Sequence, residues 1–209
     1  MLSARDVMKK SKVIPVMQVG SVKEALDTAE ALLKGGIEVY EITLRTPSAL
    51  GSIEAIAKEF ENTFCGAGTV LTQEQFKQVE DAGANFAISP GLTQSLATYE
   101  NKIPLIPGAA TASEIMHGLE YGYDAFKLFP ANVVGGVQAL KSLYKPFESV
   151  VFCPTGGVNE KNVGEYLALE NVLCVGGSWM IPTHLIQEKN YKMITKITQD
   201  LTTLLENNL

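Results

Sequence analysis

The sequence is poor in the residues that most often bind metals. Only two of its 209 residues are histidines, His117 and His184, and neither has a second ligand at metal-binding spacing. The three cysteines, Cys65, Cys153 and Cys174, are far apart and form no Cys-x-x-Cys pair. We therefore expect no metal site, and this odd number of cysteines within apolar runs predicts reduced, buried thiols in a cytoplasmic protein.

The sequence also lacks a basic excess and long apolar runs. Seventeen Lys and Arg residues against 23 Asp and Glu residues give a net charge of −6, which argues against a nucleic-acid-binding surface. The N-terminus lacks the apolar segment of a signal peptide, and no apolar stretch is long enough to span a bilayer. We expect neither nucleic acid nor a membrane as a partner, but a small anionic substrate remains compatible with this composition.

Short apolar runs recur at regular intervals along the chain. Eight of them begin at residues 13, 39, 64, 86, 103, 125, 150 and 172, and each is followed by a stretch with helical spacing. Strands that alternate with helices predict a parallel sheet. Eight such units favour an α/β fold of the (β/α)₈ TIM-barrel type over an open doubly wound sheet, with residues 1–209 as one domain. The segment "MLSARDVMKKSK" predicts a short N-terminal helix.

Charged residues occupy the inward face of two predicted strands. In "VYEITLR", Tyr40 and Ile42 share the face suited to the helices, so Glu41 and Arg45 point into the barrel. The same alternation in "AFKLFPA" points Lys127 inward. Because active sites of this fold lie where the strands end, we expect these three charges to meet at the C-terminal face.

These residue types suit the chemistry of a 2-keto acid. A buried lysine loses its proton more easily, and a neutral amine condenses with a ketone to a Schiff base. Glu41 is placed to move protons, and the Arg45 guanidinium matches a carboxylate. Paired glycines in "PTGGV" and "VGGSW" follow the last two strands, where this fold usually binds phosphate, with the Ser178 hydroxyl as a further donor.

Six motifs in order make the pattern specific. They are "EITLRT", "GAGTVL", "ISPGLT", "FKLFPA", "CPTGGV" and "VGGSW", and the match to which they belong runs in order from about residue 13 to 180. The set resembles that of the 2-keto-3-deoxy-6-phosphogluconate (KDPG) aldolases, also called 4-hydroxy-2-oxoglutarate aldolases. The resemblance implies a Schiff-base lyase that needs no cofactor, cleaves the phosphorylated keto-deoxy acid to pyruvate and glyceraldehyde 3-phosphate, and forms a homotrimer.

The resemblance also implies a role for each matching position. Lys127 resembles the Schiff-base lysine and Glu41 the proton-transfer residue. Arg45 and Thr69 resemble the residues that bind the pyruvate carboxylate. The remaining matches resemble two groups, the residues that shape the pocket (Pro90 and Thr155) and the phosphate cradle (Gly156, Gly157, Gly177 and Ser178).

Other readings of these residues stay open at this stage. Lys127 and Glu41 also suit a structural ion pair, Arg45 a solvated charge at the rim, and the glycine pairs tight turns. "GAGTV" lacks the third glycine of a dinucleotide-binding motif, so we interpret it as a barrel strand. At the level of function, the alternatives are a phosphosugar isomerase or synthase on the same barrel, and a barrel that binds a phosphorylated metabolite without catalysis.

Overall fold

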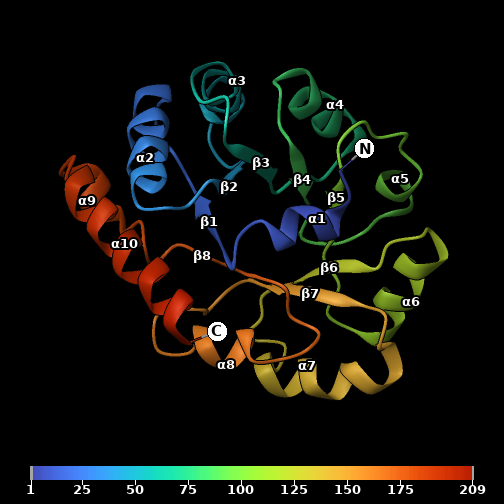
Figure 1. Cartoon of the computed structure of the whole chain (residues 1–209). Coiled ribbons are helices and arrows are strands. Elements are labelled where there is room, and N and C mark those ends of the chain that lie inside the picture. The colour runs from blue at the N-terminus through green and yellow to red at the C-terminus, as the bar shows by residue number, and fades with distance from the viewer. Residues whose placement is uncertain (1, 209) are drawn as a thin grey trace.

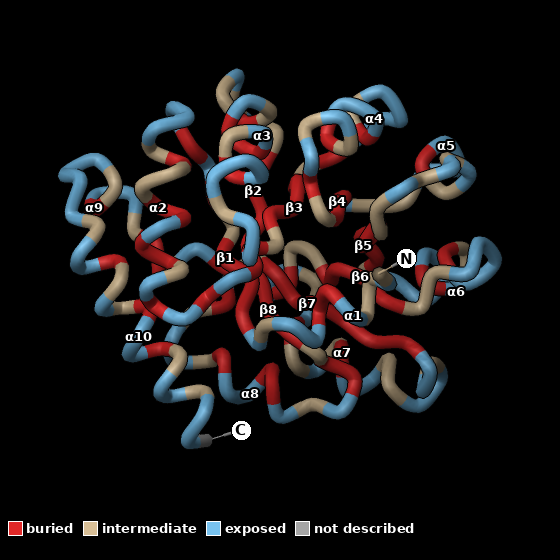
Figure 2. The backbone as a smooth tube through the Cα atoms, turned by 45° about the horizontal axis from the view of Figure 1, so that its top comes forward, coloured by how far each residue is buried: buried red, intermediate tan, exposed pale blue. Residues whose placement is uncertain are grey.

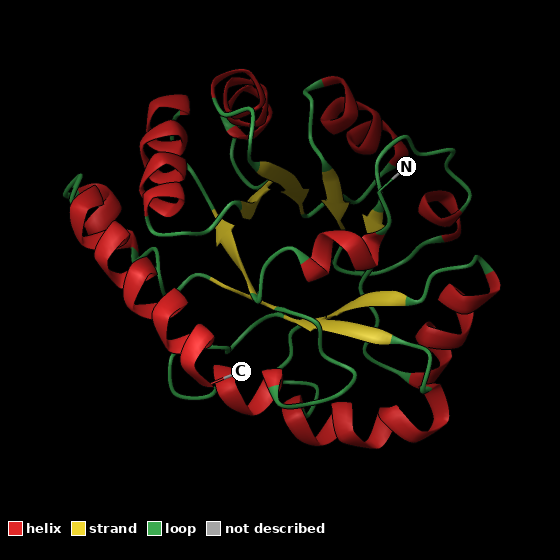
Figure 3. Cartoon of the chain, viewed as in Figure 1, coloured by secondary structure: helices red, strands yellow, loops and turns green. Residues whose placement is uncertain are grey.

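The structure, a computed structural model, describes residues 2–208, with the side chains of 2–207. Eight parallel strands surround a central axis, and all the helices except the first lie outside them (Figures 1 and 3). The strands are β1 Val13–Met17, β2 Val39–Thr43, β3 Phe64–Gly68, β4 Phe86–Ile88, β5 Leu105–Ile106, β6 Ala125–Leu128, β7 Val151–Pro154 and β8 Val175–Gly177. Each of the eight predicted apolar runs therefore contains one strand.

The sheet closes into a barrel. Six strands pair in the order β5-β4-β3-β2-β1-β8, and β6 pairs with β7. Single bridges join the two parts, Gly108 to Lys127 on one side and Thr155 to Gly176 on the other. This closure confirms the (β/α)₈ prediction. Strand β5 is only two residues long because Pro104 and Pro107 flank it and have no N–H to donate to a ladder.

Helices cover the barrel: the first lies across one end, and the others form the outer ring. The helices are α1 Ala4–Lys9, α2 Val22–Lys34, α3 Ala49–Glu59, α4 Gln73–Asp81, α5 Gln94–Ala97, α6 Ala112–Glu120, α7 Gly136–Tyr144, α8 Val163–Leu167, α9 Thr183–Gln187 and α10 Tyr191–Asn208. Ser21, Thr72 and Thr111 cap α2, α4 and α6, and Thr111 forms a capping box with Glu114. No helix within residues 2–208 is long and apolar enough to cross a membrane.

Two apolar cores lie on the two faces of the strands. Tyr40 and Ile42 pack outward into the larger core beneath the helices, as predicted from the alternation in β2. Val39 and residues of the other strands fill the lower interior of the barrel. The predicted N-terminal helix α1 lies across this end of the barrel (Figures 1 and 2), where Val7 and Met8 are fully buried.

An ion pair fixes α1 in this position. The Nε atom of Arg5 donates to Oδ2 of Asp124 at 2.7 Å, and its guanidinium also donates to the Ser149 carbonyl. Asp124 directly precedes β6. The N-terminal helix is therefore joined to the strand that carries Lys127, at the end opposite the predicted site.

Candidate active site

Lys127 and Glu41 form a buried pair inside the barrel. Lys127 comes from β6 and Glu41 from β2, and their side chains are 8% and 2% exposed. The Nζ atom of Lys127 lies 3.3 Å from Oε1 of Glu41. The inward direction predicted for both side chains is confirmed, and the barrel brings together two charges that are distant in sequence.

Two neighbouring residues shape the surroundings of this pair: Gly68 leaves space for the carboxylate, and the Phe129 ring lies near the amine. A Cβ atom built on Gly68 would lie 2.8 Å from Oε1 of Glu41, so only glycine leaves the carboxylate this position. The ring of Phe129 has its centroid 5.2 Å from the Lys127 Nζ atom, within the range of a cation–π contact. The amine is therefore held between a carboxylate and an aromatic face.

Arg45 and Thr69 meet at the rim of the barrel. The Nε atom of Arg45 donates to Oγ1 of Thr69 at 3.2 Å, which leaves the terminal nitrogens of the guanidinium for other partners. Thr69 has a φ of 61°, a left-handed conformation that is unfavourable for a β-branched residue. Such strained residues are concentrated at functional sites. Unlike the buried pair, Arg45 is exposed to solvent.

Pro90 and Thr155 follow the carboxyl ends of β4 and β7. A Cβ atom on Gly108 would lie 2.1 Å from the Pro90 carbonyl oxygen, and Gly108 bridges Lys127. Pro90 is thus joined to β6 through Gly108. Thr155 is buried, and its Oγ1 atom would lie 2.3 Å from a Cβ atom on Gly176. Both residues are placed beside the strands that surround Lys127.

The glycines after β7 adopt conformations that expose their amides. Gly156 and Gly157 have φ angles of 99° and 78°, which favour glycine. Their carbonyls accept hydrogen bonds from the Asn132 backbone N–H and the Asn162 side chain. Within residues 2–208, neither glycine N–H donates to a protein partner. Free backbone N–H groups of successive glycines suit an anion.

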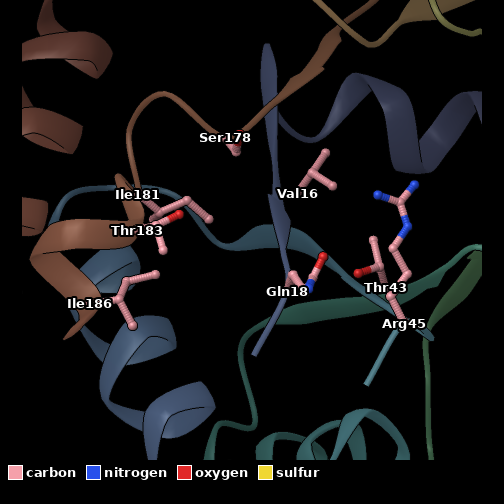
Figure 4. A pocket seen from close by; sticks show the side chains of 8 residues that line it. All are labelled: Val16, Gln18, Thr43, Arg45, Ser178, Ile181, Thr183 and Ile186. Carbon is pink, nitrogen blue, oxygen red and sulfur yellow. The ribbon is translucent and has the colours of Figure 1, made fainter. Parts of the chain in front are cut away.

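The pocket beside these residues is lined by some that the sequence analysis did not single out (Figure 4). The cavity has a volume of about 300 Å³. Its lining residues are Val16, Gln18, Thr43, Arg45, Ser178, Ile181, Thr183 and Ile186. Of the predicted site residues, this cavity includes Arg45 and Ser178, while Lys127 and Glu41 lie outside its lining. Alternation along "VIPVMQV" places Gln18 on the same inward face as Ile14 and Val16, and this pattern could have identified it.

The thiols belong to the packing of the barrel. Cys65, Cys153 and Cys174 are all free and buried, as predicted. Burial raises the pKa of the Cys65 thiol well above its ordinary value, and burial with the neighbouring Cys153 does the same for the pKa of Cys174. Among residues 2–208 there is no cluster of three or more His, Cys, Asp and Glu side chains that could hold a metal ion.

Comparison with known proteins finds relatives over most of the chain. Residues 4–197 match the family model for KDPG and KHG aldolase. The KHG/KDPG aldolase of Escherichia coli K12 is 48% identical over 200 residues, which are 95% of this chain and 94% of that protein. The 2-dehydro-3-deoxy-phosphogluconate aldolase of Dickeya dadantii is 46% identical over the same shares of the two chains.

A solved structure adds a chemical observation on a relative. The crystal structure of KDPG aldolase from Legionella pneumophila, with pyruvate captured at low pH as a covalent carbinolamine intermediate, has a TM-score of 0.92 and 48% identity. The match covers 94% of this chain and 96% of the Legionella chain. Both the sequence and the fold place the protein in one group: the chain belongs to the KDPG and KHG aldolase family.

Proposed function

We propose that the protein is a Schiff-base lyase that cleaves 2-keto-3-deoxy-6-phosphogluconate to pyruvate and D-glyceraldehyde 3-phosphate. The observation that carries this proposal is the buried Lys127 amine, 3.3 Å from the Glu41 carboxylate. A lysine is almost never buried unless another group pairs with it or a reaction uses it. The relatives named above are aldolases, which favours use in a reaction over a purely structural ion pair.

In the proposed reaction, neutral Lys127 attacks the C2 ketone and forms a carbinolamine. Loss of water gives a protonated imine, which withdraws electrons from the neighbouring bonds. The C3–C4 bond then breaks as the C4 hydroxyl loses its proton, so that the aldehyde leaves and the electron pair stays on C3 as an enamine. Protonation of C3 and addition of water to the imine release pyruvate and free lysine. Glu41 is the proposed carrier of these protons.

The rim residues are proposed to hold the two charged ends of the substrate. Arg45 presents its free guanidinium nitrogens to the carboxylate, and Thr69 offers its hydroxyl beside them. At the other end, we assign the phosphate to the amides of Gly156, Gly157 and Gly177 and to the Ser178 hydroxyl. Pro90 and Thr155 are proposed to shape the space between the two ends.

We further propose that 4-hydroxy-2-oxoglutarate is cleaved to pyruvate and glyoxylate at the same lysine. This substrate has the same keto-acid end but no phosphate, so it needs only the buried pair and the carboxylate site. The phosphosugar isomerase or synthase and the non-catalytic binding barrel are disfavoured. Neither alternative needs an inward lysine beside a carboxylate and an arginine.

The assembly and the location are also proposals. We propose a homotrimer of one-domain chains in the cytoplasm, supported by the resemblance to the family and by three free thiols, which suit a reducing compartment. Met116 and Leu119 are exposed on α6 and offer apolar surface to a neighbouring subunit. Light scattering should give three times the chain mass of 22.6 kDa, and cell fractionation tests the location.

The activity is tested with a panel of 2-keto acids and lactate dehydrogenase as the detector of pyruvate. The proposal predicts pyruvate release from the phosphorylated keto-deoxy acid, and a rate that EDTA does not change. Release of no pyruvate from any member of the panel would leave the binding barrel as the better account. Isomerised sugar phosphate in place of pyruvate would favour the isomerase.

A further inference from the structure

Gln18 directly follows β1, at a position that the proposed reaction does not use. It lies two residues beyond Val16 and four beyond Ile14, on the side of the strand that faces the barrel interior. Its exposed side chain reaches the cavity at the mouth of the barrel. In Figure 4 it lies between Ile181, Thr183 and Ile186 on one side and Thr43 and Arg45 on the other.

Of the four neutral polar side chains that line this cavity, three have free hydrogen-bonding capacity. They are the amide of Gln18 and the hydroxyls of Thr183 and Ser178, and within residues 2–208 their side chains have no hydrogen-bonding partner. The fourth polar group differs, because the Thr43 hydroxyl donates to the Met17 carbonyl at 3.1 Å. The free groups are therefore available to a ligand.

The charge of the cavity selects the class of ligand. Among the described residues that line it, Arg45 is the one charged side chain, and it is the residue proposed to bind the carboxylate. The walls around Gln18 are neutral, with Val16, Ile181 and Ile186 as apolar surface. A primary amide both donates and accepts hydrogen bonds, as a hydroxyl does. This lining fits a neutral carbon chain that carries hydroxyl groups.

The place of the cavity connects this chemistry with the reaction. It extends from Arg45 to Ser178, which are the residues proposed to hold the two ends of the substrate. The carbon chain of the acceptor aldehyde must pass between those ends. In glyceraldehyde this chain carries hydroxyls on two carbons, whereas glyoxylate has a carboxyl group in their place.

We propose that Gln18 is a specificity-determining residue, which hydrogen-bonds a hydroxyl on the carbon chain of the acceptor aldehyde. The cavity between Gln18, Thr183 and Ser178 is the subsite for this polyhydroxylated chain. The inference rests on the proposed aldolase function. It concerns which aldehydes are favoured, and not whether the lysine forms a Schiff base.

The test measures aldol synthesis from pyruvate with D-glyceraldehyde and, separately, with glyoxylate. D-Glyceraldehyde is neutral, so the phosphate site does not contribute. We expect Gln18→Met to lower the ratio of kcat/KM for glyceraldehyde to kcat/KM for glyoxylate about fivefold, the size expected for one neutral hydrogen bond. Gln78→Leu changes an exposed glutamine on α4, outside the cavity, and should keep the parent ratio.

A separate measurement distinguishes the two ways in which this account can fail. Exchange of the C3 protons of pyruvate needs no aldehyde and reports folding together with the Lys127 chemistry. If the parent protein exchanges no protons, the proposed function fails. If the parent and Gln18→Met both exchange protons but the ratio stays within twofold of the parent, the Gln18 subsite is wrong. If Gln18→Met does not exchange the pyruvate protons, the same ratio of kcat/KM values is measured for Gln18→Leu, and that ratio decides whether the subsite is right.

Discussion

The Nζ atom of Lys127 lies 3.3 Å from Oε1 of Glu41, although 86 positions separate the two residues in the sequence. The barrel makes this meeting possible because β2 and β6 both turn these side chains inward. The contact gives Glu41 direct access to the nitrogen on which the proposed intermediates form. It is also compatible with a structural ion pair, so the distinction depends on what each residue does to the reaction.

Replacement of Glu41 should slow the chemistry. Glu41→Gln keeps the shape of the side chain and removes proton transfer, so we expect kcat to fall roughly 10²–10⁴-fold. Exchange of the pyruvate C3 protons, followed by NMR in D₂O, should fall with it. An exchange rate equal to that of the parent would assign the proton carrier to another group.

Replacement of Ser178 should separate the two proposed substrates. Ser178→Ala removes a hydroxyl that we assign to the phosphate, at a cost of about 1–3 kcal/mol if the lost hydrogen bond is charge-assisted. We expect KM for the phosphorylated keto acid to rise about tenfold relative to KM for 4-hydroxy-2-oxoglutarate. Equal rises for both substrates would place the phosphate elsewhere.

The three thiols should resist modification while the protein is folded. Cys65, Cys153 and Cys174 are at most 2% exposed, and burial raises the pKa of Cys65 and Cys174, so little thiolate forms at pH 8. Mass spectrometry after iodoacetamide treatment should find none of them alkylated in buffer and all three alkylated in guanidinium. Rapid labelling of the native protein contradicts this packing.

The N-terminal helix should contribute to stability and not to catalysis. Met8 is fully buried where α1 crosses the end of the barrel opposite the site, so Met8→Ala should lower the free energy of unfolding by about 2–5 kcal/mol. Urea denaturation measures this loss, and kcat of the folded variant should match the parent. A loss below 0.5 kcal/mol would mean that α1 does not seal the barrel.

Strand periodicity accounts for much of what the sequence predicts here. Alternation along β2 and β6 is sufficient to point Glu41 and Lys127 inward, because each strand buries one face against the helices. Arg45 lies beyond the end of β2, exposed at the rim. The cavity around Gln18 could not be predicted from strand periodicity alone, because Ile181, Thr183 and Ile186 come from the segment after β8 and from α9. No periodicity links that segment to β1. The clearance that Gly68 gives Glu41 likewise depends on the β2–β3 register, in which Gly68 lies beside Thr43.

Lys127 carries the central claim, and its replacement provides the control for the decisive measurement. Lys127→Met suits the apolar surroundings and removes a buried charge, so the variant should fold. It should release no pyruvate from the phosphorylated keto-deoxy acid. Circular dichroism and a thermal melt confirm that the folded state is retained before its activity is compared with that of the parent.

The most direct measurement is reductive trapping with pyruvate and borohydride, followed by peptide mass mapping. The account predicts that the parent protein gains one covalent pyruvate adduct, on the peptide that contains Lys127, and loses its aldolase activity. Lys127→Met should gain no adduct under the same conditions. Trapping at a different lysine, no trapping in an active parent protein, or full activity in Lys127→Met would contradict the Schiff-base mechanism.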